Sequence, residues 1–428
     1  MDQKKKFSIA IIGLGYVGLP LAVEFAKHYK VVGFDINKSR VSSLNSGHDS
    51  TLEVSDNSLK AVLSENSKKG LKLTDKTKEI ENCNVYIVTV PTPVDKNNRP
   101  ILIPLIKSSE TVGKLIKRGD IVIYESTVYP GVTEDECVPI LEKESGLKFN
   151  KDFFCGYSPE RINPGDKEHT VANILKVTSG STGEIGKIVD DLYATIITAG
   201  THLAPTIKVA EAAKVIENAQ RDINIAFVNE LAKIFNKLDI DTHDVLTAAA
   251  TKWNFLHYKP GLVGGHCIGV DPFYLAQKAQ EVGYHSELIL TGRRLNDSMG
   301  EYVATEVLKL MVKNNLSVKD AKVLMLGITF KENCPDIRNT KVIDVYKVFK
   351  SFNMINVDVY DPWADKKQVK KEFGIDLIEK PTNKYDVIVH VVAHDKFKSI
   401  DFSVIKSKEG IVYDVKGTLD INKITKRL

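Results

Sequence analysis

Short apolar runs alternate with amphipathic segments through the first half of the chain. The apolar runs cover residues 8–13, 31–35, 85–90, 121–125, 153–157 and 176–178. Strand-like runs that alternate with helix-like segments are typical of a parallel sheet with helices on both faces. Residues 1–204 are therefore predicted to form a doubly wound α/β domain.

The pattern changes at Pro205, after which residues 206–239 contain neither Gly nor Pro. The apolar side chains of this segment recur at spacings of three, four or seven residues: Val209, Ala213, Ile216, Ile223, Phe227, Leu231 and Ile234. That periodicity predicts one long helix with a single apolar stripe. Because so long a helix usually bridges domains or forms a dimer, residues 205–317 are predicted to be a central helical domain.

A second alternation of strand-like and helix-like segments follows, with apolar runs at 322–326, 356–360, 386–392 and 411–415. The sequence at 323–327 has the pattern of 9–13, but the two further glycines of that turn are missing. Residues 318–428 are predicted to form a second Rossmann-like domain that binds something other than a whole dinucleotide. The expected fold class is α/β, with two Rossmann-like doubly wound domains joined by a long central helix and a helical dimerisation region.

Composition excludes several classes of protein. A length of 428 residues suits two or three domains, and 43% hydrophobic with 27% charged residues is ordinary for a soluble globular chain. A net charge of +4 is too small to indicate nucleic-acid binding, and no arginine-rich stretch supports it. No stretch reaches the roughly 18–20 uninterrupted apolar residues of a membrane span, so we expect neither a nucleic-acid nor a membrane partner.

The start of the chain superficially resembles a secretory signal, because three lysines precede the apolar run at 7–23. Glycines inside that run and the lack of a small-residue cleavage site argue against it. The cysteines are odd in number, widely spaced and without a CxxC pair: Cys83, Cys137, Cys155, Cys267 and Cys334. We therefore expect reduced thiols in a cytoplasmic protein without a metal site.

The clearest chemical motif is a glycine turn formed by Gly13, Gly15 and Gly18, directly after the first predicted strand. In such a turn the first glycine permits a tight bend, the second lets backbone approach a pyrophosphate, and the third lets helix pack on strand. Asp35 ends the next strand, where a carboxylate accepts hydrogen bonds from ribose hydroxyls and repels a 2′-phosphate. The turn therefore predicts an NAD site.

Other residues are assigned to this cofactor site by their place in the sequence: Tyr16, Val17, Thr92 and Thr127. Arg40 has two open interpretations. It either lies along the adenine or is a solvated helix arginine.

Cys267 lies in the most unusual stretch of the remaining sequence, the glycine-rich segment 259–272. Four glycines leave little side-chain bulk, so backbone can close round a substrate and expose the thiol. An inert core thiol is the alternative, because free cysteine is among the most buried residue types. Lys214 and Asn218 are four residues apart on the predicted long helix, where they either stabilise an oxyanion together or form a solvated surface pair.

Together these motifs resemble the UDP-glucose/GDP-mannose dehydrogenases, which oxidise a sugar-nucleotide C6 alcohol to a carboxylate in two NAD-dependent steps. The resemblance covers nearly the whole chain, in family order: the turn at 13–18 with Asp35; Glu125-Ser-Thr127-Val; Ser158-Pro-Glu160; Lys214 with Asn218; Gly264-Gly-His-Cys267 with Asp271; and Gly327, Phe330-Lys331 and Asp336-Ile-Arg338. The segment 264–272 is similar to the subgroup acting on UDP-N-acetylhexosamines, which supplies N-acetylated uronic acids for surface polysaccharides. Val270 and Pro164 stand where the UDP-glucose branch usually has Lys and often has a second Glu.

The resemblance implies that Cys267 adds to the aldehyde as a thiohemiacetal, which becomes a thioester. Lys214, directly or through water held by Asp271, accepts or stabilises the hydroxyl proton. Lys214 and Asn218 then stabilise the oxyanion. Three residues are implied in hydrolysis of the thioester by water: Glu160, Thr127 and Asp271.

The resemblance also implies a UDP-sugar bound by cations of the second Rossmann-like domain. Lys331 and Arg338 match the family's nucleotide-diphosphate site, and the planar fork of Arg suits phosphate. The remaining candidate substrate-binding residues are Glu160, Arg161, Lys214, Asn218, Tyr258, Lys259 and Gly264. Family members associate through the central helices, so a homodimer or higher homo-oligomer is expected, in which Arg293 or Arg294 reaches a neighbouring subunit's site.

Several alternatives stay open. UDP-N-acetylglucosamine is the favoured substrate, but the galactosamine epimer differs only at the C4 hydroxyl, and UDP-N-acetylmannosamine and UDP-glucose follow. A two-electron β-hydroxyacid dehydrogenase also combines a Rossmann domain, a long helix and a Lys-x-x-x-Asn pair, but needs neither Cys267 nor a second nucleotide-binding domain. A non-catalytic NAD-sensing protein is opposed by the intact set of catalytic candidates.

Overall fold

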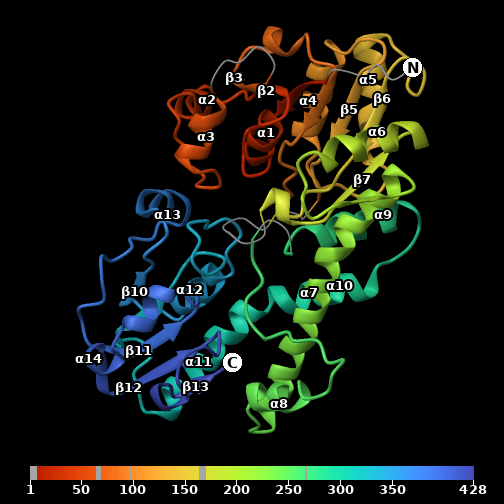
Figure 1. Ribbon diagram of the computed structural model, residues 1–428. Helices are drawn as coiled ribbons and strands as arrows, with labels where there is room; N and C mark the ends of the chain where they lie inside the picture. Colours follow the sequence, from red (N-terminus) through yellow and green to blue (C-terminus); the bar gives the residue numbers. More distant parts are fainter. Residues whose placement is uncertain (1–6, 64–68, 96–98, 163–169, 266–267) are drawn as a thin grey trace. The chain divides into compact units, whose positions relative to one another are not determined.

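The computed structural model describes residues 7–63, 69–95, 99–162, 170–265 and 268–428 (Figure 1). The chain divides into two compact units, Met1–Glu217 with Phe273–Val282 and Asn218–Pro272 with Gly283–Leu428. The division falls within one long helix. The three domains expected from the sequence stay a prediction.

The first unit is built on an eight-stranded sheet in the order β3-β2-β1-β4-β5-β6-β7-β8. Its strands are β1 (Ser8–Ile12), β2 (Lys30–Phe34), β3 (Gly70–Thr74), β4 (Val85–Val88), β5 (Ile121–Tyr124), β6 (Phe154–Tyr157), β7 (Lys176–Gly180) and β8 (Thr201–Leu203). The order reverses between β1 and β4, which is the switch point where such sheets bind ligands at the carboxyl ends of their strands. The predicted doubly wound α/β fold is confirmed.

The first sheet departs from the prediction in three of its strands. The pair β6 and β7 is antiparallel, whereas the other paired strands of this sheet are parallel. The edge strands β3 and β8 have no continuous apolar run: β3 alternates Leu with Lys, and β8 has only three residues, two of them exposed. A run-based prediction therefore misses both edges.

Helices connect the strands of the first unit: α1 (Gly18–Ala26), α2 (Lys38–Asn45), α3 (Asp56–Val62), α4 (Ile103–Gly113), α5 (Val138–Ser145) and α6 (Gly183–Ala194). Short helical turns are η1 (Thr77–Ile80), the π-helix η2 (Val132–Cys137) and η3 (Val171–Asn173). Apolar side chains of β1, β2, α1 and α6 form one buried core, whose aromatic members Phe25 and Tyr193 stack edge to face at 5.5 Å. This core holds the start of α1 against the end of β1.

The predicted long helix is α7 (Ile207–Lys237), with 31 residues. Its buried residues include four polar ones: Glu211, Lys214, Asp222 and Asn229. Its exposed apolar side chains, each 44–55% accessible, are Val209, Ile216, Phe227 and Ile234. Apolar side chains are also buried along this helix, among them Ile207, Val215 and Val228, so α7 carries apolar residues on both its buried and its exposed faces. The other central helices are α8 (Thr242–Ala249), α9 (Asp271–Glu281) and α10 (Glu287–Asp297).

The second unit contains a five-stranded parallel sheet in the order β10-β9-β11-β12-β13. Its strands are β9 (Val323–Leu326), β10 (Val357–Tyr360), β11 (Tyr385–His390), β12 (Lys406–Asp414) and β13 (Lys426–Arg427). Its helices are α11 (Met299–Lys313), α12 (Val342–Ser351), α13 (Lys366–Phe373) and α14 (Phe402–Ile405), with turns η4 (Asp395–Ser399) and η5 (Ile421–Lys423). This second common doubly wound order has its switch point between β9 and β11.

Candidate active site

Each of the three glycines in the turn after β1 is required for a different structural reason. Gly13 has φ +98°, in the left-handed region, and its N–H donates to the Phe34 carbonyl at 2.8 Å. A Cβ on Gly18 would lie 2.0 Å from the Gly13 carbonyl oxygen, so a side chain there would push α1 away from β1. A Cβ on Gly15 would have no atom within 4 Å. The open backbone at Gly15 fits the close approach of a pyrophosphate.

Two side chains at the switch point fix this turn. The Thr89 hydroxyl, directly after β4, lies 2.9 Å from the Gly13 carbonyl oxygen. Asp35 accepts the Leu14 N–H at 2.8 Å through Oδ2 and the Asn37 N–H at 2.8 Å through Oδ1. The half-buried Asp35 carboxylate is thereby held beside the turn, in the position that suits ribose hydroxyls. Sequence reasoning missed Thr89, whose only signal is its place at a strand end.

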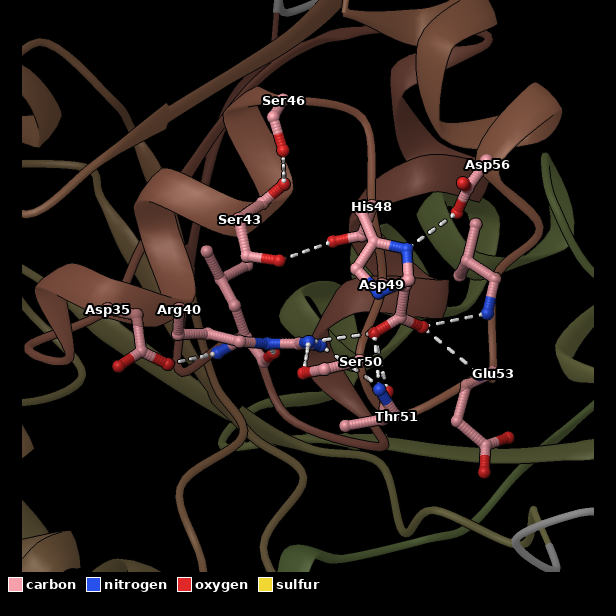
Figure 2. A network of polar contacts seen from close by, with 12 residues as sticks. Asp35, Arg40, Ser43, Ser46, His48, Asp49, Ser50, Thr51, Glu53 and Asp56 are labelled. Carbon is pink, nitrogen blue, oxygen red and sulfur yellow. Dashed lines mark hydrogen bonds and ion pairs between the residues drawn. The ribbon is translucent and has the colours of Figure 1, made fainter.

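Arg40 is held beside the same turn. Figure 2 shows its guanidinium group directed at Asp49. Its Nε donates to the Leu14 carbonyl at 2.9 Å, and its Nη1 lies 2.7 Å from Oδ1 of the buried Asp49. Although burial opposes it, hydrogen bonds from Thr51, Val54 and Arg40 hold the pKa of Asp49 below its ordinary value. With a side chain only 10% exposed, Arg40 is not a solvated helix arginine. Its contact with adenine stays a prediction.

Thr92 and Thr127 come together within the first unit. The Thr92 hydroxyl donates to the Thr127 carbonyl at 2.7 Å, and the hydroxyl of Tyr274 on α9 donates to the Thr92 carbonyl at 2.5 Å. The predicted cofactor residue Thr92 is therefore tied to the end of β5 and to α9. Tyr16 and Val17 are half-buried at the start of α1.

Glu160 belongs to a buried ionic cluster. Lys176 Nζ lies 2.9 Å from Glu160 Oε2 and 2.9 Å from Glu125 Oε2, and the Tyr193 hydroxyl donates to Glu125 Oε1. Burial alone would raise the pKa of Glu160, but Lys176 and the N–H groups of residues 161 and 162 hold it below its ordinary value. Burial raises the pKa of Glu125 to about 7 despite Lys176. Sequence reasoning placed Glu160 and the Glu125 motif but missed Lys176 and Tyr193.

Lys214 and Asn218 both lie on α7, as predicted. Lys214 is 7% exposed, and its ammonium has no ion-pair partner among the residues that the structure describes. Asn218 Nδ2 donates to Oδ2 of the buried Asp271 at 2.5 Å. Neither is therefore a simple solvated residue, and two predicted catalytic residues, Asn218 and Asp271, are in direct contact. A buried cation without a counter-charge is typical of a site that receives an anion.

The glycine-rich segment packs against the loop between β9 and α12 of the second unit. A Cβ on Gly264 would lie 2.6 Å from the Asn339 carbonyl oxygen, and one on Gly265 would lie 2.8 Å from the Phe330 ring. Two of the four glycines are therefore needed because a side chain at either position would clash with this loop. The sequence argument explained these glycines only by the small bulk that they leave around a thiol. Cys267 lies outside the described residues.

The predicted UDP-binding residues lie on that neighbouring loop. Arg338 pairs with Asp336 through both Nε and Nη2, at 2.9 and 2.6 Å. Lys331 is half-buried, with Nζ 5.9 Å from the centre of the Phe330 ring. The contacts of Gly264 and Gly265 thus bring the segment that precedes Cys267 to the loop that carries Lys331 and Arg338.

Asp361 is the counterpart of Asp35 in the second sheet, but it is used differently. Its Oδ2 accepts the Ile328 N–H at 2.7 Å, as Asp35 accepts that of Leu14. It also accepts from three further N–H groups and from His394 Nε2, and it is 3% exposed. A carboxylate so fully engaged is closed to a ribose, which supports the prediction that this domain does not bind a whole dinucleotide.

The remaining candidates are placed as follows. Arg161 contacts Glu217 and the Leu175 carbonyl, Tyr258 is half-buried and Lys259 is exposed. Arg293 is 2% exposed and pairs with Asp222 and Asp297 of its own chain, whereas Arg294 is exposed. Of the two arginines, only Arg294 is accessible to a neighbouring subunit. Across the described ranges, no group of three His, Cys, Asp or Glu side chains is arranged to hold a metal ion.

Comparison with known proteins decides the family. Residues 7–197 match the NAD binding domain of the UDP-glucose/GDP-mannose dehydrogenases, residues 208–298 their central domain and residues 324–421 their UDP binding domain. The chain belongs to the UDP-glucose/GDP-mannose dehydrogenase family. This dehydrogenase therefore uses NAD as its cofactor and a UDP-sugar as its substrate, as the sequence predicts.

Similar proteins cover the whole chain. The dehydrogenase is 58% identical over 428 residues to the UDP-N-acetyl-D-glucosamine 6-dehydrogenase of Pseudomonas aeruginosa, covering 99% of this chain and 100% of that protein. It is 55% identical over 420 residues to protein CapL of Staphylococcus aureus, covering 97% of each. The solved UDP-D-ManNAc dehydrogenase of Pyrococcus horikoshii has a TM-score of 0.88 at 30% identity, with 98% of each chain covered. Within the described ranges, no helix combines the length and the apolar character needed to cross a membrane.

Proposed function

We propose that this dehydrogenase oxidises the C6 hydroxyl of UDP-N-acetylglucosamine to a carboxylate, for the synthesis of a surface polysaccharide. The observation that carries the proposal is the 58% identity, over the full length of both chains, with the P. aeruginosa UDP-N-acetyl-D-glucosamine 6-dehydrogenase. Relatives named for UDP-N-acetyl-D-mannosamine and for N-acetyl-D-galactosaminuronic acid are 32% and 29% identical. That difference favours the glucosamine epimer.

The reaction is a four-electron oxidation at one carbon. R–CH2OH, two NAD⁺ and one water give R–COO⁻, two NADH and three protons. NAD, when bound, supplies the hydride acceptor for both steps. The open backbone at Gly15 and the fixed Asp35 carboxylate support binding of its pyrophosphate and ribose.

Residues of α7 and the glycine-rich segment perform the first half of the reaction. The Lys214 ammonium, buried and without a described counter-charge, stabilises the alkoxide as C6 loses hydride. Cys267 then adds to the aldehyde, which gives a thiohemiacetal whose oxyanion accepts hydrogen bonds from Lys214 and from the Asn218 amide. The bond to Asp271 fixes that amide in one orientation.

The second half of the reaction releases the acid. Loss of the second hydride converts the thiohemiacetal to a thioester, and water cleaves its C–S bond to give the carboxylate and the Cys267 thiol. Glu160, with Thr127 and Asp271, positions this water. The low pKa of Glu160 supports a role as an ionised hydrogen-bond acceptor at neutral pH.

The exposed face of α7 supports a homo-oligomeric enzyme. Its exposed face carries large apolar side chains, among them Phe227 at 55% and Ile234 at 44% accessibility. A large exposed apolar surface on a helix indicates an interface. A second copy of this chain covers that face, which makes the enzyme a homodimer or a higher homo-oligomer.

The described thiols support a cytoplasmic location for the enzyme. None of the described cysteines forms a disulfide, and all four are buried. Reduced thiols suit the cytoplasm, where the enzyme acts.

The substrate proposal is tested by kcat/KM for a panel of four UDP-sugars, followed by NADH absorbance. We expect UDP-N-acetylglucosamine to be preferred over its galactosamine and mannosamine epimers and over UDP-glucose. A preference of tenfold or more for another member, about 1.4 kcal/mol, would contradict the assignment. The five-stranded second sheet and its match to a UDP binding domain oppose a two-electron β-hydroxyacid dehydrogenase.

A further inference from the structure

The antiparallel pairing of β6 and β7 has a chemical consequence. Because β7 runs opposite to β6, its first residue lies at the edge of the sheet where β5 and β6 end. Lys176, that first residue, thereby meets Glu125 after β5 and Glu160 after β6. In an all-parallel sheet a residue at the start of β7 would lie at the opposite edge. The reversal of β7 therefore places the Lys176 ammonium at the edge where α/β sheets bind ligands.

The cluster around Lys176 is buried from every side. Lys176 is 3% exposed, Glu125 1% and Tyr193 0%. One ammonium serves two carboxylates, and Tyr193 of α6 donates to Glu125 from the other side. Buried charges are costly unless they are paired. A buried cluster of three ionisable groups at the ligand-binding edge of the sheet therefore calls for a functional explanation.

Glu160 is held almost completely by this arrangement. Its Oε1 accepts the Arg161 and Ile162 N–H groups, each at 2.6 Å, and its Oε2 accepts Lys176 at 2.9 Å. A carboxylate offers about four acceptor positions, and these described donors occupy three of them. One position on Oε2 is left for a water molecule, and its direction is set by the bond to Lys176.

We propose that Lys176 is a positioning residue, which keeps the Glu160 carboxylate ionised and aims its remaining acceptor position at the water that cleaves the thioester. Glu125 is the second carboxylate paired with Lys176, and a Gln at this position still offers an amide oxygen that accepts from the ammonium. The inference rests on the proposed role of Glu160 in thioester hydrolysis. Among the residues that the structure describes, the charged and titratable groups of this cluster are Lys176, Glu125 and Tyr193. The Arg161–Glu217 ion pair begins one residue further along the chain.

The test compares two variants that differ only at Lys176. Lys176→Met alone would leave two uncompensated buried carboxylates, which threatens folding. Glu125→Gln combined with Lys176→Met leaves the cluster with a net charge of −1, as in the wild type, and removes the counter-charge of Glu160. Glu125→Gln alone retains Lys176 and is the matched control. Lys72→Met, in an exposed ion pair with Glu79, controls for the loss of a lysine.

Two readouts separate positioning from a general loss of structure: the acid limb of the pH profile of kcat, and the thioester adduct on Cys267 measured by mass spectrometry after acid quench. The double variant should shift the acid limb upward by roughly 1–3 pH units. It should also slow hydrolysis by roughly 10²-fold, so that the adduct accumulates. Glu125→Gln alone and Lys72→Met should do neither.

A double variant whose acid limb and adduct level equal those of Glu125→Gln would overturn the positioning role. Failure of the proposed function is distinguishable, because wild-type enzyme would then yield no carboxylate from UDP-N-acetylglucosamine at any pH.

Discussion

The glycine turn allows a sharp test, because a methyl group has opposite consequences at two of its positions. At Gly18 a Cβ would lie 2.0 Å from the Gly13 carbonyl oxygen and 2.4 Å from the Thr89 hydroxyl. Since the first of these atoms is backbone, α1 must move away from β1 in Gly18→Ala. Overpacking of this kind costs about 1–3 kcal/mol. For a unit of this size that lowers Tm by roughly 2–12 °C.

At Gly15 the same methyl group meets no atom within 4 Å. Gly15→Ala should therefore change the free energy of unfolding by less than about 0.5 kcal/mol. The methyl group fills the open space at Gly15 that the proposed NAD site reserves for a pyrophosphate, so the NAD dissociation constant should rise by about tenfold or more. Stability and cofactor affinity are thus separated between the two positions.

The measurements are thermal unfolding without cofactor and NAD binding by calorimetry. Gly183→Ala, at the start of α6, is the matched control, because a Cβ there also has no atom within 4 Å and the site lies outside the turn. It should leave both quantities unchanged. Wild-type NAD affinity in Gly15→Ala, or wild-type stability in Gly18→Ala, would refute the reasoning.

Three further predictions concern other parts of the chain. Phe227→Asp places a charge on the exposed apolar face of α7 and should shift the enzyme toward monomer in sedimentation velocity; an unchanged oligomer would exclude this face as the interface. Asp361→Asn should lower the free energy of unfolding in urea by roughly 3 kcal/mol at neutral pH, because a buried acceptor of five donors is lost. The Asp361 pKa is lowered in the folded state, so its contribution is present above the unfolded pKa of about 4 and is lost as pH falls through the folded pKa; a difference from the variant that does not shrink at low pH contradicts this. Cys267→Ser should abolish the thioester adduct and slow turnover severely, and near-normal turnover would rule out the covalent mechanism.

Much of the fold is predictable because buried strands and long helices leave periodic apolar patterns. The run at 8–13 and the stripe of α7 are examples, and both elements form within two residues of the expected bounds. The edge strand β3 is not predictable in this way, because its solvent-facing Lys72 breaks the apolar run. The antiparallel pairing of β6 and β7 also cannot be predicted from the apolar pattern, because that pattern does not depend on the direction in which a strand runs.

The site residues divide in the same way into those that the sequence predicts and those that it does not. Glycine positions and Asp35 are recognisable locally, because each role depends on backbone that is close in sequence. Lys176 carries no such signal: it lies 16 residues from Glu160 and 51 from Glu125, and only the reversal of β7 brings the three together. Thr89 and Asp361 likewise depend on which strands are neighbours in a sheet.

The central claim is a four-electron oxidation of UDP-N-acetylglucosamine at C6. Wild-type enzyme is incubated with limiting UDP-N-acetylglucosamine and excess NAD, and NADH is counted by absorbance while the sugar nucleotide is identified by mass spectrometry. The account predicts two NADH per sugar consumed and the C6 carboxylate as the product. One NADH per sugar with an aldehyde product would contradict it.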